Sequence, residues 1–507
     1  MTANWFQNAE DLLSRRVRLI GVGIALCGLL WRIYYARDFY LDPDEAMHYL
    51  VAVHPWHGLV GFYRNATRVV HPPLFIAMLQ GILLFGRAEW LLRLVPSLAG
   101  AAFPWFVALW MQRMTGNAAA LVAQLFLTFS PTLIEQSTEV RAYGPAFLFL
   151  ALALVLLQQA LDSGSGRFMI AFHLFLYLAI LTEYCVAWFV AALGIYALAW
   201  LWKNPASANQ RMIWALGQVG ALSLYLFLYF THIARFSHVG LLGMYSTWLQ
   251  GAFPRSNENL FAFALRGTYR QFLYEFQLRP AAWLGLGAFI LGLCRLWRSR
   301  SLAVILLVVP FVFACLGALL HLFPYGATRH TSVLAISVAV GLGCGLALLA
   351  RERVLPVLAI ALPIVVAWNA LSTDAFLPIA RYRHHRPALQ SAIGFLLRDV
   401  PSGSVIVTDT DTDLILSYYL GCPDYGYYDV DEAYRMRDCS GLRMVVAPTF
   451  QFSGPAELRD TLALVRGKYR LERPVWVVAG GFSVDVSTPV SNARPFGQTV
   501  AIFEDSE

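Results

Sequence analysis

Charged residues are scarce in this sequence: they make up only 14% of its 507 residues, and Lys203 and Lys468 are its only lysines. A soluble domain of this length carries more charge than that. The formal net charge of +7 comes mostly from arginines in short segments between apolar runs. Such arginines are typical of topology signals and not of a nucleic-acid surface. The composition therefore excludes an ordinary soluble protein and argues against a nucleic-acid partner.

Several motifs of soluble enzymes and pumps are also missing. The sequence has no P-loop, no GxGxxG and no HExxH, which argues against a nucleotide-driven pump. Its seven cysteines show no metal-ligand spacing. Five of them lie in apolar segments, where they are expected to pack as small hydrophobes. The other two, Cys422 and Cys439, could form a disulfide if the C-terminal part lies outside the cytoplasm.

Long apolar runs are what the sequence has in abundance. Hydrophobic residues make up 58% of the chain, and the runs reach the roughly 20 residues that a helix needs to cross a bilayer. We therefore predict a polytopic α-helical membrane protein with about 11 transmembrane helices. The expected spans lie at residues 19–36, 91–111, 118–133, 143–161, 168–181, 184–202, 212–230, 281–297, 302–323, 331–350 and 354–371.

The charges between these spans indicate which side of the membrane each loop faces. With the N-terminus inside, the loops rich in arginine, such as the one with Arg295, Arg298 and Arg300, fall in the cytoplasm, as the positive-inside rule requires. The apolar segment 73–85 is short for a span and is expected to lie at the interface. If it crossed, every later loop would change sides and the agreement would be lost.

Two domains are predicted. Residues 1–372 form the transmembrane domain, with outer loops at 37–90 and 231–280, and residues 373–507 form a small extracytoplasmic α/β domain. In the α/β domain, apolar and alternating runs predict strands at 404–408, 443–448, 475–479 and 499–503 and helices at 411–420 and 456–465.

Three carboxylates stand close together just after the first span, in the segment Asp42-Pro43-Asp44-Glu45. Such carboxylates repel one another and need a cation, a metal ion or shared protons. One of them could take a proton from an acceptor hydroxyl, although Asp42 or Asp44 could instead only cap the helix that follows. We favour a functional role for Asp44 with Glu45, supported by Asp42 and His48.

Other polar residues are predicted at helix ends on the same outer side. Arginine binds phosphate with two parallel hydrogen bonds, and histidine binds phosphate or a metal ion. The alternative for each arginine is a local ion pair or anchoring among lipid headgroups. The residues of this group are His71, Glu139, Arg141, Tyr143, Glu183 and Arg329.

In their order along the chain, these motifs resemble the membrane-embedded glycosyltransferases of the GT-C class. The likeness is to the branch with protein O-mannosyltransferases, the lipid A aminoarabinose transferase and lipopolysaccharide-core glycosyltransferases. Members share an Asp-Glu pair after the first helix, here Asp44-Glu45, and a His-Pro-Pro segment, here from His71. They also share a segment like 139–143 and a late arginine, here Arg329. The resemblance is clearest over residues 42–161, and the C-terminal domain carries no matching motif.

The resemblance implies an inverting glycosyltransferase that uses a polyprenyl-phosphate-linked sugar. The expected location is the bacterial inner membrane, with the active site facing the periplasm or exterior. Asp44 would deprotonate the acceptor hydroxyl, and Glu45 would orient the acceptor or help to bind a metal ion. The acceptor, whether glycan, lipid or protein, stays open.

The resemblance also implies how the departing lipid phosphate is bound. Arg141, Arg329 and His71 would stabilise its charge, and Glu139 and Tyr143 would shape the pocket. No cofactor is certain. A divalent metal ion is neither required nor excluded, and its ligands would be Asp44, Glu45 and His71.

Two other functions fit parts of the sequence. An oligosaccharide ligase would use arginines and a histidine in a large outer loop, and the loop 231–280 offers Arg235, His238, Arg255, Arg266 and Arg270. That function leaves the Asp-Glu pair and the His-Pro-Pro segment unexplained. A transporter of lipid-linked sugars would carry charges near mid-span or broken helices in matching halves, which this sequence lacks.

Overall fold

The computed structural model describes residues 2–37, 40–237, 249–375, 385–422, 435–449, 452, 454–470, 475–480 and 501. The chain forms two compact units. The membrane unit comprises Met1–Tyr34, Val70–Phe75 and Arg93–Leu377, and the α/β unit comprises Tyr35–Val69, Ile76–Leu92 and Pro378–Glu507. Most of the predicted outer loop 37–90 therefore groups with the C-terminal part of the chain instead of with the spans.

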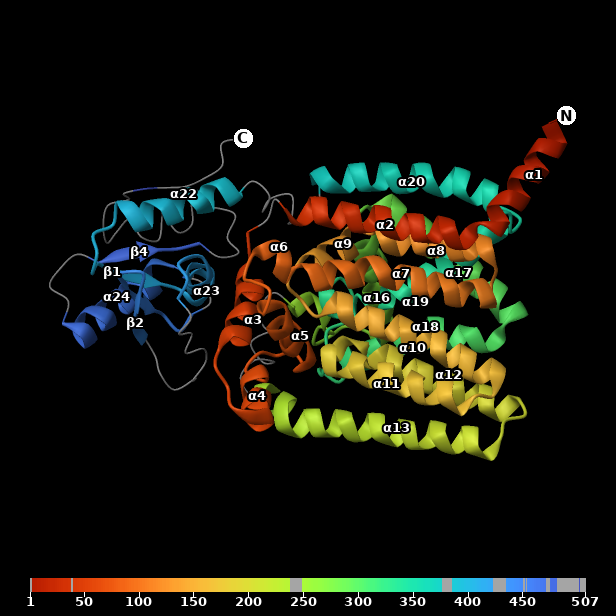
Figure 1. Cartoon of the computed structure of the whole chain (residues 1–507), viewed down its shortest axis with the longest axis horizontal. Coiled ribbons are helices and arrows are strands. Elements are labelled where there is room, and N and C mark those ends of the chain that lie inside the picture. Colours follow the sequence, from red (N-terminus) through yellow and green to blue (C-terminus); the bar gives the residue numbers. More distant parts are fainter. Residues whose placement is uncertain are drawn as a thin grey trace. The chain divides into compact units, whose positions relative to one another are not determined.

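The membrane unit consists of helices (Figure 1). Their bounds are α1 Thr2–Arg15, α2 Val17–Ala36, α7 Leu94–Met114, α8 Asn117–Phe129, α9 Pro131–Thr138, α10 Tyr143–Ser163, α11 Gly166–Thr182, α12 Ala187–Lys203, α13 Ala208–Leu228, α14 Ala234–Ser237, α16 Leu260–Phe276, α17 Arg279–Ser299, α18 Val304–Leu319, α19 Leu334–Leu349 and α20 Val354–Ala375.

The predicted spans form helices, and the polytopic helical fold class is confirmed. In the part of the chain that the structure describes, seven helices are long and apolar enough to cross a membrane, or eight if the bent pair α8–α9 is one span. Two further predicted spans form the shorter apolar helices α11, Gly166–Thr182, and α19, Leu334–Leu349, and a third lies in the apolar part of α20, Val354–Asn369. The predicted span 118–133 is broken, with a bend of 54° between α8 and α9. Pro131, which has no N–H group, begins the second helix.

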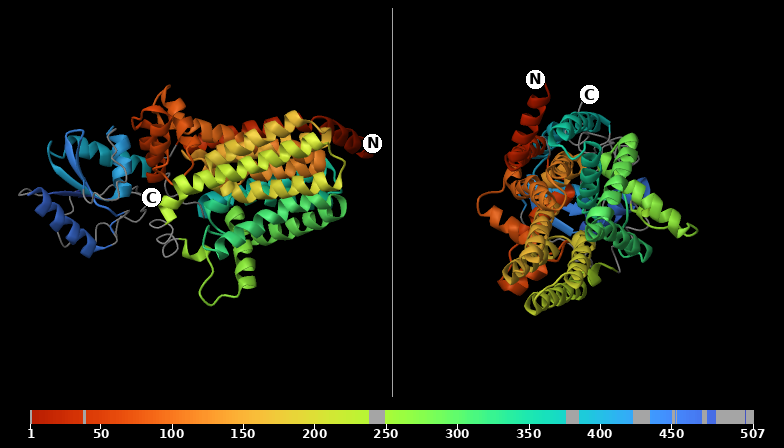
Figure 2. Two further views of the ribbon diagram at one scale, coloured as in Figure 1. Left: turned by 90° about the horizontal axis from the view of Figure 1, so that it is seen from below. Right: turned by 90° about the vertical axis from the view of Figure 1, so that its right-hand side faces the viewer.

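The centre of this unit is packed by small residues. Helix α19 is buried along nearly its whole length and contacts α17 and α8, while α10 contacts α7 and α11. A Cβ atom at Gly292 of α17 would lie 1.9 Å from the carbonyl oxygen of Gly341 on α19. The two backbones therefore approach as closely as glycine allows, which is a common way to pack helices in membranes. Figure 2, right, looks along these helices and shows the bundle.

The α/β unit combines helices from the N-terminal part with a C-terminal sheet. Its N-terminal helices are α3 Pro43–Val53, α4 Gly58–Ala66 and α6 Glu89–Leu92, and α5 Leu74–Leu83 begins in the other unit. Its C-terminal elements are α22 His385–Arg398, β1 Val405–Thr408, α23 Thr410–Tyr419, β2 Arg435–Cys439, β3 Leu442–Val446, α24 Pro455–Tyr469 and β4 Trp476–Val478. Helix α3 packs against α23, which is why the two parts form one unit.

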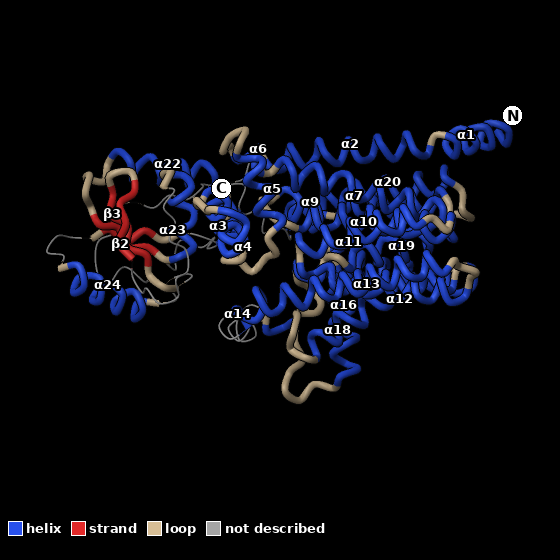
Figure 3. Tube along the Cα trace, turned by 60° about the horizontal axis from the view of Figure 1, so that its bottom comes forward, coloured by secondary structure: helices blue, strands red, loops and turns tan. Residues whose placement is uncertain are grey.

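The sheet has the strand order β2-β3-β1-β4. Strand β1 pairs in parallel with β3 and β4, and β2 pairs with β3 antiparallel. Alternate residues of the sheet face opposite sides: Ile406 packs with residues of α22 and α23, whereas Val407 packs with Val465 of α24. Helices thus cover both faces (Figure 3).

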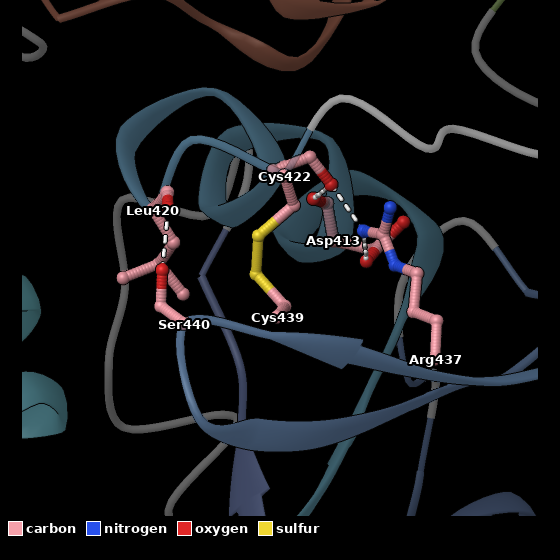
Figure 4. The surroundings of a disulfide bond; sticks show 7 residues. Asp413, Leu420, Cys422, Arg437, Cys439 and Ser440 are labelled. Carbon is pink, nitrogen blue, oxygen red and sulfur yellow. Dashed lines mark hydrogen bonds and ion pairs between the residues drawn. A yellow bond between two sulfur atoms is a disulfide. The ribbon is translucent and has the colours of Figure 1, made fainter.

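Most of the predicted α/β elements are present. Strands β1, β3 and β4 and helices α23 and α24 form where the sequence predicts them, whereas the predicted strand 499–503 lies almost entirely outside the described residues. Helix α22 and strand β2 were not predicted. Cys422 and Cys439 form the disulfide that the sequence allowed. Figure 4 shows it beside the ion pair of Arg437 with Asp413.

Candidate functional site

The candidate base Asp44 lies in the first turn of α3, which is held by a capping box. The carboxylate of Asp42 accepts a hydrogen bond from the backbone N–H of Glu45 at 2.7 Å. The carboxylate of Glu45 in turn accepts one from the N–H of Asp42 at 3.1 Å. This reciprocal arrangement pairs two backbone donors that would otherwise be unsatisfied at the start of the helix. Two of the three clustered carboxylates therefore fix the backbone around the third.

The side chains near Asp44 differ in exposure. Glu45 is 2% exposed, whereas Asp44 is partly exposed. His48, one turn along α3, is fully buried, and its Nδ1 lies 2.6 Å from the carbonyl oxygen of Asp44. Glu45 and His48 are thus buried, whereas Asp44 is partly exposed to solvent.

The membrane unit holds the candidate phosphate-binding residues. Arg141 lies between α9 and α10, is 2% exposed, and forms an ion pair with Glu139 in which Nε and Oε2 are 2.5 Å apart. The segment between these helices is short and buried, so the guanidinium group is confined to the place where α10 begins. The local ion pair considered from the sequence is therefore formed.

His71 and Glu183 form a second pair, although they lie 112 residues apart in the chain. Nδ1 of His71 is 2.7 Å from Oε2 of Glu183. The other oxygen of Glu183 accepts a hydrogen bond from the N–H of Tyr184 at 2.9 Å. Glu183, which is 3% exposed, ends α11 and fixes the orientation of the imidazole ring.

Tyr143, the first residue of α10, lies near these groups. It lies within electrostatic range of Glu183, Arg329 and Arg141. Its side chain is fully buried, and its hydroxyl has no hydrogen-bond partner in the described part of the chain. A buried polar group without a partner is uncommon and calls for an explanation. Three predicted phosphate-binding residues, Arg141, Arg329 and Tyr143, thus lie near one another and near the supporting residue Glu183, and the Tyr143 hydroxyl is one that a ligand could bond.

One buried arginine was not singled out from the sequence. Arg32, near the end of α2, is fully buried and donates hydrogen bonds to Ser137 Oγ at 2.7 Å and to the carbonyl oxygen of Thr128 at 2.9 Å. These acceptors flank the break between α8 and α9. An arginine inside an apolar span was the available signal, because charges there usually have a buried partner.

The sequence left a divalent metal ion open, with Asp44, Glu45 and His71 as its ligands. Across the described ranges, no group of three or more His, Cys, Asp or Glu side chains is placed to hold a metal ion. The carboxylates of Asp42 and Glu45 already accept hydrogen bonds from backbone amides.

Comparisons with known proteins agree with this architecture. Residues 70–230 match the model of the family described as dolichyl-phosphate-mannose-protein mannosyltransferase. That match includes His71, Arg141 and Glu183, but it begins after Asp44 and ends before Arg329. No curated protein matches the sequence.

Several solved structures are similar in fold. ArnT from Cupriavidus metallidurans bound to undecaprenyl phosphate has a TM-score of 0.50 at 14% identity, over 80% of this chain and 84% of that chain. The apo form of the same protein has a TM-score of 0.49 at 16% identity over the same shares. The apo oligosaccharyltransferase of Archaeoglobus fulgidus has a TM-score of 0.46 at 12% identity, over 78% of this chain and 63% of that chain. The fold is that of GT-C-like membrane glycosyltransferases, and the resemblance seen in the sequence is confirmed.

Proposed function

We propose that this protein is an inverting glycosyltransferase that moves a sugar from a polyprenyl-phosphate donor to an acceptor hydroxyl on the outer face of the membrane. The family match over residues 70–230 and the GT-C-like fold support glycosyltransferase chemistry. A fold alone does not define a reaction, so the proposal depends on the residues of the two units.

The observation that carries the proposal is the neighbourhood of Tyr143. Two arginines, Arg141 and Arg329, lie within electrostatic range of a buried hydroxyl that has no partner in the described part of the chain. A lipid phosphate would accept a hydrogen bond from Tyr143 and charge-assisted bonds from the arginines. As the bond between sugar and phosphate breaks, negative charge grows on the phosphate, and groups already in place stabilise it without rearranging.

Asp44 supplies the base in this mechanism. Its carboxylate takes the proton from the acceptor hydroxyl, whose oxygen attacks the anomeric carbon. The bond from that carbon to the phosphate oxygen breaks, and the lipid phosphate leaves with the electron pair. Attack opposite the leaving group inverts the anomeric centre. Glu45 contributes by holding the backbone on both sides of Asp44.

Two observations support the donor class and the outer location. The protein of similar fold from Cupriavidus metallidurans was crystallised with undecaprenyl phosphate, a polyprenyl phosphate. The disulfide between Cys422 and Cys439 fits an oxidising compartment, since such bonds are rare in the cytosol. A bacterial inner membrane, with the active site facing the periplasm or exterior, fits both, and cell-envelope glycans or lipids are the acceptors to test first.

Two of the arginines on which the ligase alternative depends have other partners in the structure, and its histidine, His238, lies outside the described residues. Arg266 donates to Glu258 at 2.6 and 2.7 Å and to the carbonyl oxygen of Gly251 at 2.9 Å. Arg270 also donates to Gly251. These contacts hold α16 against the segment before it. Both arginines therefore have a structural role that does not require an anionic substrate.

A transfer assay tests the proposal. Membranes with the wild-type protein are incubated with radiolabelled polyprenyl-phosphate sugars and an envelope extract, and transfer of label to any acceptor is measured. Asp44→Asn should lower the rate by roughly 10²- to 10⁴-fold. Asp460→Asn, which alters an exposed carboxylate on α24, is the matched control and should retain full activity.

Two results would contradict the proposal. Equal transfer by the wild type and Asp44→Asn would remove Asp44 as the base. If no labelled donor is consumed by the folded wild type, sugar transfer from polyprenyl phosphates is wrong, and transport of lipid-linked sugars becomes the function to test.

A further inference from the structure

The C-terminal part of the chain contacts the segment that leads to Asp44 through one hydroxyl group. Tyr419, the last residue of α23, accepts a hydrogen bond from the backbone N–H of Leu41 at 2.8 Å. The same hydroxyl donates to Oε1 of Glu89, at the start of α6, at 2.9 Å. A single side-chain oxygen therefore joins three segments of the α/β unit that are far apart in the sequence.

Glu89, which accepts the hydrogen bond from the Tyr419 hydroxyl, is itself held by another residue. Arg386 of α22 donates two hydrogen bonds to Oε2 of Glu89, at 2.6 and 3.2 Å. The side chains of Arg386 and Glu89 are 25% and 15% exposed, so the pair is partly shielded from water. A carboxylate that accepts the Tyr419 proton makes the tyrosine oxygen a better acceptor for Leu41, because linked hydrogen bonds polarise one another.

The position of Leu41 gives this contact its importance. Leu41 is fully buried and directly precedes Asp42, the first residue of the capping box. The Tyr419 hydroxyl fixes the backbone just before the box, and Glu45 fixes it just after Asp44. The candidate base therefore lies on a short segment that is anchored at both ends, and the N-terminal anchor comes from the C-terminal part of the chain.

We propose that Tyr419 is a positioning residue, whose hydroxyl holds the segment with Asp44 in the geometry needed for proton abstraction. The catalytic part of this inference rests on the proposed function. The C-terminal α/β fold then acts as a support for the catalytic segment, in addition to any role in acceptor choice. A base must lie within hydrogen-bond distance of the proton that it takes, and a shift of about 1 Å can lower the rate by about 100-fold.

Tyr418 provides a matched comparison on the same helix. Its hydroxyl donates to the carbonyl oxygen of Arg87 at 2.8 Å, and its ring packs edge-on against Tyr49 of α3 with centroids 4.8 Å apart. It therefore contributes to the same packing of α23 on the N-terminal segments but makes no hydrogen bond to Leu41. Tyr418→Phe and Tyr419→Phe each remove one hydroxyl and keep the aromatic ring.

The experiment uses the full-length protein in lipid nanodiscs and two readouts. Hydrogen–deuterium exchange is followed in the peptide that contains residues 40–49. In Tyr419→Phe, exchange at Leu41 should become about fivefold faster, because a hydrogen bond is lost.

The second readout is steady-state kinetics. With the donor and acceptor found by the transfer assay, the kcat of Tyr419→Phe should fall roughly 10- to 100-fold. The KM for the donor should not change, because the proposed donor site lies in the membrane unit. Tyr418→Phe should leave exchange at Leu41 and kcat unchanged.

Each outcome is decisive. Unchanged exchange at Leu41 in Tyr419→Phe overturns the anchoring role. Faster exchange with an unchanged kcat overturns positioning and leaves a structural contact only. Equal losses of kcat in both variants would assign the effect to general packing. If the wild type transfers no sugar, the proposed function and the catalytic part of this inference both fail, while the exchange comparison still decides whether Tyr419 holds the segment.

Discussion

The two units hold their candidate functional residues by different means. In the membrane unit, side chains far apart in the sequence pair with one another: His71 with Glu183 and Arg32 with Ser137, separated by 112 and 105 residues. In the α/β unit, the Asp42 carboxylate binds a backbone N–H three residues away, and the His48 imidazole contacts a backbone carbonyl oxygen four residues away. The first arrangement requires the tertiary fold, whereas the second forms with a single helix turn.

The physical reason lies in the surroundings of each site. A charge among membrane helices loses its hydration and is tolerated when it has a partner. Removal of that partner leaves a buried charge unpaired, which is strongly unfavourable. At the start of a helix, the loss of one capping side chain costs about 1 kcal/mol. Substitutions should therefore be more damaging in the membrane unit than at the capping box.

Within the membrane unit, the largest effect is expected at Arg141. Arg141→Ala removes a proposed phosphate contact and leaves Glu139 without its ion pair, so kcat/KM for the donor should fall roughly 10²- to 10³-fold. Arg141→Lys should lie between the alanine variant and the wild type, because lysine lacks the planar fork that binds two oxygens. Steady-state kinetics with correctly folded protein measure both. Wild-type activity in Arg141→Lys would contradict two-point binding of the phosphate.

The disulfide tests whether the two units are stabilised separately. Replacing Cys422 and Cys439, which are 17 residues apart, with serine should lower the free energy of unfolding of the α/β unit by about 3 kcal/mol. The bond joins β2 to the segment just after α23, so hydrogen exchange should become faster in β2 and α23 and stay slow in α10 and α19. A similar increase in α10 and α19 would show that the units unfold together.

Much of the fold could be predicted because the signals are local. Apolar runs predicted the membrane helices, and short apolar strands predicted β1, β3 and β4. Strand β2 was missed since its sequence, Arg-Met-Arg-Asp-Cys, is mostly polar, as suits an edge strand with one hydrogen-bonded neighbour. The break before α9 was missed because apolar residues continue through Pro131.

The sequence offers candidate residues for the site but not the contacts between them. Asp42 as a helix cap was among the alternatives, and the first-turn Glu45 that completes the box is a local pattern. The pairs His71–Glu183 and Tyr419–Leu41 join segments 112 and 378 residues apart. No local periodicity encodes such contacts, because they depend on how helices and sheet pack.

A smaller effect is expected from Asp409, which caps α23. Burial raises the pKa of its carboxyl to about 6, from an ordinary value of 3.8. Because the folded-state pKa is the higher one, this group's contribution to stability is complete below about pH 4 and is lost as the pH rises through 6. Asp409→Asn keeps an oxygen that can accept from the N–H of Thr412.

The asparagine variant should therefore gain stability relative to the wild type as the pH rises. The difference in the free energy of unfolding should grow by on the order of 2 kcal/mol between pH 4 and pH 7. Denaturant titrations of both proteins across this range measure it. A difference that stays constant with pH would mean that Asp409 ionises as readily in the folded protein as in the unfolded chain.

The most discriminating comparison, with the smallest expected effect, is a double-mutant cycle on His71 and Glu183. If the pair positions the imidazole ring for the donor phosphate, His71→Gln and Glu183→Gln should each raise the KM for the donor, and the double variant should be less impaired than the sum. The coupling should be about 1 kcal/mol, since the residues are in direct contact.

Asp44→Glu combined with Glu183→Gln provides the control cycle, because the mechanism assigns Asp44 to proton transfer and Glu183 to donor binding. Coupling within the first pair and additivity in the second would show that the two units contribute separable steps. Additivity within His71–Glu183 would instead mean that this contact stabilises the helix ends without acting on the donor.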